Sequence, residues 1–281
     1  MIRAIAMFAA AICAVAEPNP DWTRPFPAHR VIGNLYYVGT YDLACFLITT
    51  PKGNILINTG VDGSVPMIKT SIESLGFKFK DTKILLTTQA HVDHVAGMAE
   101  MKRLTGAKLL ATDGDAPVLE DGGKSDYLWT TQEYRFAPVK VDGRIKDGQK
   151  IALGGTELTA YSHPGHTRGS ASYGLTIAEN GRTYRVLIAN MGSINPGTVL
   201  IGNKKYPQIA DDYARTFREQ KKLDCDIFLS SHASQYQLHE KWKPAQAYSP
   251  DTFLDPAGYK AAVSRAETSY LEWLAKEKGS N

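Results

Sequence analysis

Four side chains that can bind a metal ion stand within six residues, in the stretch Gln89-Ala90-His91-Val92-Asp93-His94. The residues before it, 83–87, form an apolar run that predicts a buried β-strand, and a helical pattern follows from Val95 to Leu104. Histidine and aspartate fit poorly into a strand or a core unless another group pairs with them. The stretch therefore indicates a metal site at the end of a strand.

The spacing of the four side chains favours two adjacent metal ions. Gln89 and His91 are two residues apart, so an extended backbone points both to one side. Asp93 and His94 come where the chain turns into the helix and can reach a second point. The alternative is that Asp93 caps the helix and the histidines are loop residues. For Asp93 alone this alternative stays open, but similar residues recur at other strand ends.

Two further histidines follow predicted strands. A β region from Lys150 to Tyr161 ends in Ser-His-Pro-Gly-His-Thr, which contains His166, and the apolar run 227–229 is followed by His232 after two serines. The six nitrogen and oxygen ligands divide into two sets of three, which leaves room for water or substrate on each metal. Histidine with aspartate and no cysteine favours zinc, with iron and manganese as alternatives.

The elements that must position these residues alternate between strands and helices. Three short β runs between Val31 and Ile57 predict a meander, and a helix from Ser64 to Gly76 follows. Asn180-Gly181 predicts a two-residue hairpin turn, and an apolar stripe predicts a C-terminal helix from Pro256 to Leu274. This order favours an α/β fold of layered sheets with helices outside.

Composition narrows the class of protein. The 281 residues are 43% hydrophobic and 22% charged, which is ordinary for a globular protein of one large domain or two small ones. The net charge is +3 and the basic residues form no run. Nucleic-acid binding is therefore not expected.

The N-terminus predicts export. Residues 1–16 combine Arg3, an apolar stretch and a small-x-small cleavage site, as in a secretory signal, and the stretch is too short to span a bilayer. We therefore expect a signal peptide at 1–16, one domain at 17–281, periplasmic localisation and no membrane contact after cleavage. Cys45 and Cys225 could pair in an exported protein. Their apolar surroundings favour two buried thiols.

With these motifs, the chain resembles the metallo-β-lactamase superfamily and, within it, the subclass B3 enzymes. The family pattern His-x-His-x-Asp-His stands here with Gln89 in the first position, and Gly165-His166-Thr167 and His232 also match. Gln89 resembles the Gln-variant, or GOB-type, branch. The resemblance covers nearly all of the chain from Val31 onward. It implies a four-layer αββα sandwich with two mixed sheets between helices.

The resemblance also implies the ligand sets. Gln89, His91 and His166 would form the first zinc site, and Asp93, His94 and His232 the second. Because an amide oxygen is a weaker zinc donor than imidazole, we expect the first site to bind metal more weakly. Gln89 would then either ligate weakly or only hydrogen-bond a water.

The implied activity is zinc-dependent hydrolysis of the amide of a small-molecule β-lactam, with Asp93 orienting the attacking water and a monomer as the working form. Ser193, Lys124 and Tyr127 are candidate substrate-binding residues. A lactonase or thioester hydrolase of the same fold is the first alternative, and a non-enzymatic zinc-binding protein is the second. Asn190-Met191-Gly192 offers no carboxylate where the lactonase and glyoxalase II relatives carry a bridging aspartate, which argues against the first alternative.

Overall fold

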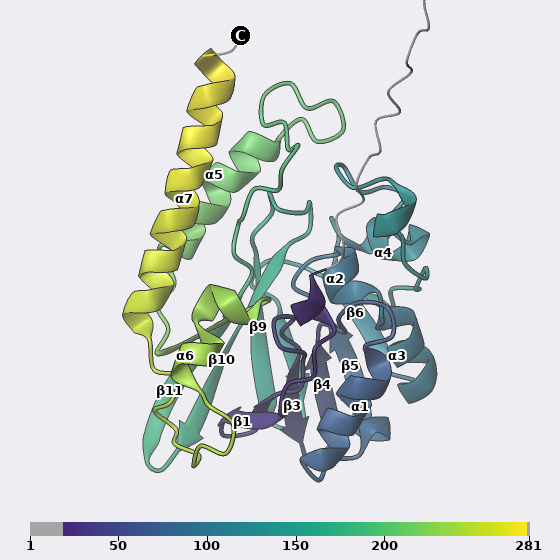
Figure 1. Ribbon diagram of the computed structural model, residues 1–281, viewed down its shortest axis with the longest axis vertical. Helices are drawn as coiled ribbons and strands as arrows, with labels where there is room; N and C mark the ends of the chain where they lie inside the picture. The colour runs from purple at the N-terminus through teal and green to yellow at the C-terminus, as the bar shows by residue number, and fades with distance from the viewer. Residues whose placement is uncertain (1–18, 280–281) are drawn as a thin grey trace, which may run out of the picture.

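Two mixed β-sheets face each other and carry helices on their outer sides (Figure 1). The computed structural model describes residues 19–279, so the predicted signal at residues 1–16 lies outside the described part. The four-layer sandwich expected from the sequence is confirmed. No helix among residues 19–279 combines the length and the apolar character needed to cross a bilayer.

The first sheet has seven strands that follow one another in chain order. The first four pair antiparallel as the predicted meander, and the pairs from β4 to β7 are parallel. Its strands are β1 (His29–Ile32), β2 (Leu35–Tyr37), β3 (Phe46–Thr50), β4 (Gly53–Ile57), β5 (Thr82–Leu86), β6 (Lys108–Thr112) and β7 (Gly143–Ile145).

The second sheet has five strands in the order β12-β11-β10-β9-β8. All of its pairs are antiparallel except the parallel pair of β11 and β12. Its strands are β8 (Lys150–Leu153), β9 (Thr156–Ser162), β10 (Ala171–Glu179), β11 (Arg182–Ala189) and β12 (Ile227–Ser230). Asn180 and Gly181 both have positive φ and form the predicted hairpin turn between β10 and β11.

Alternate residues of the first sheet face two different cores. Leu47 and Leu56 pack outward with Ile68 and Met101 from α1 (Val65–Ser74) and α3 (Met98–Thr105). Ile48, Ile55 and Ile57 face the second sheet. Burial on both faces explains why these strands are apolar throughout, and each fully buried side chain contributes about 1.5–3 kcal/mol.

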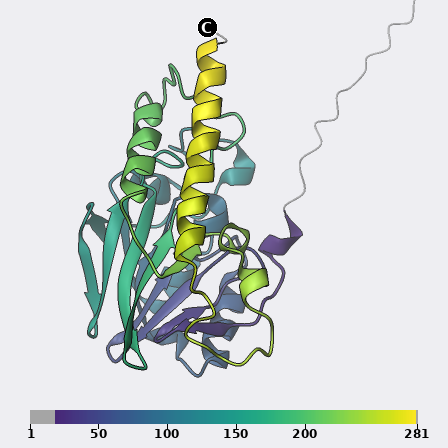
Figure 2. The same ribbon diagram turned by 90° about the vertical axis from the view of Figure 1, so that its left-hand side faces the viewer.

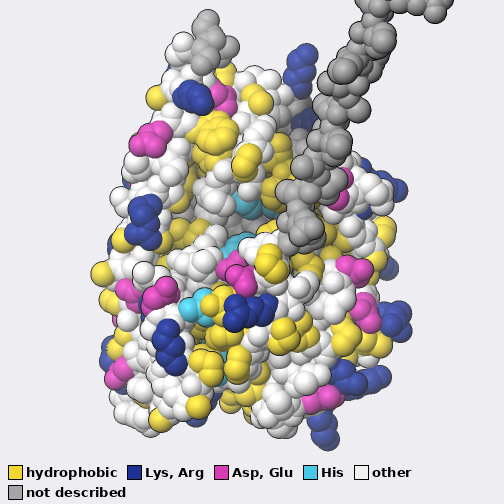
Figure 3. All heavy atoms as spheres, viewed as in Figure 1, with side chains coloured by type: hydrophobic (Ala, Val, Ile, Leu, Met, Phe, Trp, Pro, Cys, Tyr) yellow, Lys and Arg dark blue, Asp and Glu magenta, His cyan; other side chains and the backbone are white. Residues whose placement is uncertain are grey.

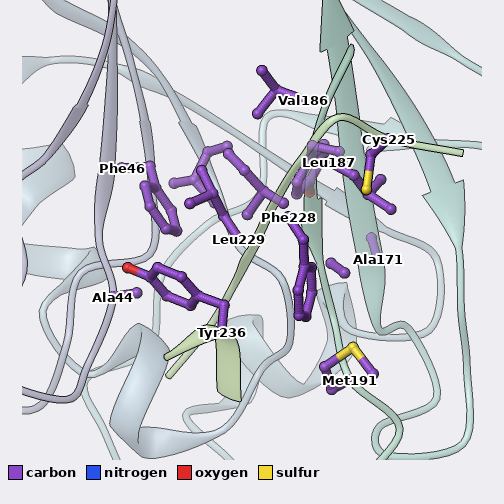
Figure 4. Packing of buried hydrophobic residues seen from close by; sticks show 14 of the residues in the cluster. Ala44, Phe46, Ala171, Val186, Leu187, Met191, Cys225, Phe228, Leu229 and Tyr236 are labelled. Carbon is purple, nitrogen blue, oxygen red and sulfur yellow. The ribbon is translucent and has the colours of Figure 1, made fainter. Parts of the chain in front are cut away.

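The second sheet is covered by α5 (Ile209–Gln220) and α7 (Pro256–Gly279), which lie side by side in both views (Figures 1 and 2). Figure 4 shows the larger core, where Phe46 lies near Tyr236, with Phe228 and Leu229 of β12 beside them. The remaining short helices are α2 (Val92–Val95), α4 (Ala116–Asp121), α6 (Leu238–Lys241) and four 3-10 turns, Pro20–Trp22, Phe79–Asp81, Gln132–Tyr134 and Ala233–Tyr236.

Two predicted elements differ in the structure. The helix expected over Val95–Leu104 is interrupted near its start, since α2 ends at Val95 and α3 begins at Met98, with Ala96 and Gly97 between them. A Cβ at Gly97 would lie 2.7 Å from the carbonyl oxygen of Thr59, so the close approach of this loop requires glycine. The β region expected from Lys150 to Tyr161 is a hairpin that turns at Gly154-Gly155. Cys45 and Cys225 are buried free thiols, as expected.

Candidate metal centre

Three strand ends deliver the predicted ligands to one pocket of about 130 Å³. The stretch 89–94 follows β5, His166 lies in the loop between β9 and β10, and His232 follows β12. Gln89, His91, Asp93, His166 and His232 line the pocket, and His94 is fully buried. Figure 3 shows histidine side chains in a hollow near the middle of this face.

His91 and His166 point ring nitrogens at each other. Nδ1 of His91 lies 3.1 Å from Nε2 of His166. Nδ1–H of His166 donates to the carbonyl oxygen of Ser193 at 2.7 Å, which places the proton away from the partner ring. Nε2 of His91 faces Oδ2 of Asp126 at 3.5 Å. Two imidazole nitrogens therefore converge within hydrogen-bond distance, a geometry in which both could bind one cation.

Burial keeps His166 neutral. It lowers the pKa of His166 to about 3. For Asp126, burial favours the neutral acid, but the facing ring of His91 and hydrogen bonds from the backbone N–H groups of Trp129 and Leu128 lower the pKa below its usual value. Its Oδ1 accepts from the backbone N–H groups of Leu128 and Trp129, both at 2.7 Å. Asp126 thus fastens the loop that carries Trp129 beside His91.

Asp93, His94 and His232 form a second set, whose ligand atoms lie within 4.8 Å of one another. Oδ2 of Asp93 is 3.1 Å from Nε2 of His94 and 3.4 Å from Nε2 of His232. Nδ1–H of His232 donates to Oδ2 of Asp42 at 2.8 Å, so its Nε2 faces Asp93. A carboxylate, two imidazoles and a carboxylate behind one imidazole form a typical zinc-binding arrangement.

The electrostatics of this second set favour a positive charge. Burial opposes the charged form of His232, but Asp42 and Asp93 together raise its pKa to about 9. Burial also opposes ionisation of Asp93, yet its electrostatic interactions with His94 and His232 hold its pKa well below the usual range. A bound cation would satisfy the same carboxylates.

Several buried atoms of the two sets have no hydrogen-bond partner among the described residues. They are Oδ1 of Asp93 and Nδ1 of His94, together with Nε2 of His94 and Nε2 of His91, which face carboxylate oxygens at 3.1 and 3.5 Å without forming a hydrogen bond. Buried polar atoms without partners are costly, and most proteins satisfy them. The unpaired donor atoms and the chemistry of the set therefore fit a metal such as zinc.

Asp115 ties the two ligand-bearing loops together. Its Oδ2 accepts from the backbone N–H of Ala90 at 2.8 Å and from the hydroxyl of Thr167 at 3.0 Å, and its Oδ1 accepts from the N–H of Gly169 at 2.9 Å. Burial raises its pKa to about 6 despite these bonds. Asp115 was not among the residues singled out from the sequence, since an aspartate in a loop carries no distinguishing local pattern.

The three candidate substrate residues lie in different places. Ser193 lines the pocket, and its hydroxyl is 3.3 Å from Nδ1 of His166. Tyr127 is buried behind His166 and its hydroxyl donates to the carbonyl oxygen of that residue at 3.3 Å. Lys124 is exposed on the same loop and is not part of the pocket lining.

Sequence reasoning missed several residues that contact the ligands. Asp42 bonds His232, Asp126 faces His91, and Asn190 donates from Nδ2 to Oε1 of Gln89 at 3.0 Å. Trp22 and Trp129 also line the pocket. None of these residues stands in the ligand motif, and each reaches the site through tertiary folding.

Comparisons with known proteins agree with this geometry. The family model described as the metallo-beta-lactamase superfamily matches residues 42–232. A beta-lactamase from Chitinophaga pinensis is 46% identical with a TM-score of 0.89, covering 93% of this chain and 98% of that chain. The class B3 di-zinc metallo-beta-lactamase LRA-12 from an Alaskan soil metagenome is 48% identical with a TM-score of 0.88, over 90% and 96% of the two chains.

The metallo-beta-lactamase GOB-18 from Elizabethkingia meningoseptica is 48% identical with a TM-score of 0.89, over 92% of this chain and 96% of that chain. Curated relatives are more distant. A hydroxyacylglutathione hydrolase from Rhodopseudomonas palustris (strain HaA2) is 26% identical over 64% of this chain and 60% of that protein. The chain spans about half the length of the curated relatives it matches. On the strength of the family match and the solved structures, the chain belongs to the metallo-β-lactamase superfamily and, within it, to the class B3 enzymes.

Proposed function

We propose that this protein hydrolyses the amide bond of β-lactam antibiotics with zinc as its cofactor. The observation that carries the proposal is the convergence of two ligand sets on one pocket, from three strand ends. Similarity to class B3 β-lactamases over at least nine-tenths of the chain supports it. Carbapenems, cephalosporins and penicillins share the strained amide that such a site would attack.

The proposed ligands follow the two sets. Gln89, His91 and His166 would hold the first zinc ion, and Asp93, His94 and His232 the second. When bound, zinc lowers the pKa of water toward neutrality and polarises a carbonyl group. The first site is the weaker in this proposal, because its third donor is the neutral amide oxygen of Gln89, a weaker zinc donor than imidazole.

Asp93 would orient the attacking water. Its Oδ2 faces His94 and His232, and its Oδ1 has no partner among the described residues. A carboxylate with a strongly depressed pKa stays ionised at neutral pH and accepts a hydrogen bond from water at that free oxygen. Asp93 thereby fixes the direction from which the water approaches the lactam carbonyl.

The pocket walls would position the substrate. Ser193 is an exposed residue that lines the pocket, and we assign its hydroxyl to the substrate carboxylate. Trp22 and Trp129 line the same pocket, and the ring centroids of Trp129 and His91 are 4.4 Å apart. These apolar rings would limit the access of bulk water to the reacting amide. Tyr127 would not contact the substrate but would position His166 through the hydrogen bond to its backbone carbonyl.

We also propose export to the periplasm with residues 1–16 as a cleaved signal, and a monomer of one domain as the working form. β-Lactam antibiotics act outside the cytoplasm, so an exported enzyme would meet its substrate there.

The alternative is a thioester hydrolase, which the 26% identity to hydroxyacylglutathione hydrolases favours. Purified protein is to be assayed with a carbapenem, a chromogenic cephalosporin and a glutathione thioester, before and after chelator treatment. We expect cleavage of the β-lactams, lost with chelator and restored by zinc. Cleavage of the thioester alone, or β-lactam cleavage that survives complete demetallation, would overturn the proposal.

A further inference from the structure

We propose that Asn190 is a positioning residue that fixes the carboxamide of Gln89 in one orientation and thereby sets the metal affinity of the first site. The inference rests on the proposed ligand set of Gln89, His91 and His166. It concerns a residue outside the ligand motif, directly after the end of β11 and in the pocket lining.

Hydrogen bonds fix both the backbone and the side chain of Asn190. Its backbone N–H donates to Oγ of Ser172 at 2.9 Å, and its carbonyl oxygen accepts from Nε2 of Gln220 at 2.7 Å. Its side chain is 1% exposed. Nδ2 lies 3.1 Å from the carbonyl oxygen of Thr88 and 3.0 Å from Oε1 of Gln89. Rotation of this side chain would break two hydrogen bonds.

The backbone carbonyl of Thr88 decides which end of each amide faces which partner. A carbonyl oxygen can only accept, so the atom of Asn190 beside it must be the amino nitrogen. That nitrogen can only donate, so the atom of Gln89 beside it must be the oxygen. The reversed orientation of Asn190 would bring its oxygen against two acceptors, and Oδ1 of Asn190 has no partner among the described residues in its present place.

A glutamine ligand depends on a neighbour that fixes its orientation more than a histidine ligand does. The two ends of a carboxamide have nearly the same shape, but only the oxygen can bind a cation. If Gln89 turned over, its amino group would face the amino group of Asn190 and the hydrogen bond would be lost. In the observed orientation one lone pair of Oε1 accepts from Asn190, and the second stays available for a metal ion.

The test is a double-mutant cycle read out by metal binding rather than by catalysis. Stepwise zinc affinities would be measured by competition with a chromophoric chelator, and cobalt occupancy by its visible absorption. The variants are Asn190→Ala, the larger apolar Asn190→Leu, Gln89→His and the pair Gln89→His with Asn190→Ala. Thr88 keeps a hydrogen bond from the N–H of Ala171 at 2.8 Å, so its carbonyl is not left unpaired in these variants.

We expect Asn190→Ala and Asn190→Leu to weaken the first site roughly tenfold, as loss of an outer-shell partner commonly does, and to leave the second site unchanged. In the Gln89→His background the same change should have little effect, because an imidazole has no amide end to orient. An equal loss in both backgrounds, unchanged binding or tighter binding in Asn190→Ala overturns the inference.

Thr88→Val is the matched control. It removes a hydroxyl at the same strand end that donates to Asn58 at 3.2 Å and accepts from Ser231 at 2.8 Å, and it leaves both amides in place. We expect its first site to keep the wild-type affinity, and a loss as large as in Asn190→Ala would overturn the inference by indicating general loosening. Wild-type protein that binds one equivalent of metal would overturn the two-site proposal as well. If the wild-type protein binds two equivalents of metal but Asn190→Ala leaves both affinities unchanged, only the proposed role of Asn190 is overturned.

Discussion

Nδ1 of His232 lies 2.8 Å from Oδ2 of Asp42, although the two residues are 190 positions apart in the chain. The other oxygen of Asp42 accepts from the backbone N–H and the hydroxyl of Ser234, at 3.2 and 2.9 Å. Burial disfavours the carboxylate, but hydrogen bonding from His232 and Ser234 lowers its pKa to about 2. Asp42 therefore stays charged and fixes which ring nitrogen of His232 faces Asp93.

The first prediction follows from this pairing. Asp42→Asn removes the charge behind His232 with little change in shape, so the tautomer and basicity of the ring are no longer fixed. We expect the zinc affinity of the second site to fall roughly tenfold to hundredfold, measured by chelator competition. Ser234→Ala is the control, since it removes one bond from Asp42 but keeps the carboxylate. Unchanged affinity in Asp42→Asn would show that His232 needs no such partner.

The second prediction concerns the donor that sets this chain apart from the His-x-His-x-Asp-His pattern. Gln89→His replaces a neutral amide oxygen by imidazole, a stronger zinc donor, so we expect tighter binding at the first site. Metal titration of wild type should show two unequal steps, and the variant should bring them closer together. Equal stepwise affinities in the wild-type protein would contradict the prediction.

The sequence placed the candidate ligand residues directly after apolar β runs, and in the structure these strand ends meet at one pocket. The stretch 89–94 could be placed by its strand and helix patterns alone. Gly154-Gly155 is a turn signal in the sequence, but the apolar pattern continues on both sides of it and favoured one β region instead of a hairpin.

Other features of the site could not be predicted from local patterns. Asp42 and Asp126 act through pairings that depend on the completed fold, and neither stands in a motif. Lys124 and Tyr127 are three residues apart on one loop, yet one is exposed and the other is buried behind His166. The conformation of that loop is set by the carboxylate of Asp126 and by its packing, which residue types alone do not reveal.

The third prediction concerns the glycine beside His166. Gly165 has φ +132°, and a Cβ there would lie 2.8 Å from the ring of Tyr213. Gly165→Ala should therefore strain the backbone and displace the loop that carries His166. We expect a loss of about 1–3 kcal/mol in the free energy of unfolding, measured by urea denaturation, together with a lower zinc content.

Gly181→Ala separates the effect of backbone strain from the effect of contact with Tyr213. Gly181 also has positive φ, at +77°, but a Cβ there meets nothing within 4 Å. We expect it to cost about 1 kcal/mol from backbone strain alone and to leave zinc binding intact. If both variants lose the same stability and keep the same zinc content, contact with Tyr213 does not govern the position of His166.

The fourth prediction is an acid-dependent loss of stability from His29, far from the ligands in the sequence. Its ring stacks on Trp242 with centroids 3.8 Å apart, and Nδ1–H donates to the carbonyl oxygen of Pro27 at 2.9 Å. Burial lowers the pKa of His29 to about 4, although the bond to Pro27 opposes this. The unfolded chain, with a pKa near 6.5, binds the proton first.

The contribution of His29 is therefore fully present above about pH 6.5, is lost as the pH falls toward 4, and is constant below that. The full loss is on the order of 3 kcal/mol. His29→Phe keeps an aromatic ring against Trp242 but cannot titrate, so its stability should fall less steeply over this range. Urea denaturation of both proteins in chelator, from pH 7.5 to 4.5, removes any contribution from metal release. A stability difference that does not change with pH would contradict the prediction, because only titration of the buried ring separates the two curves.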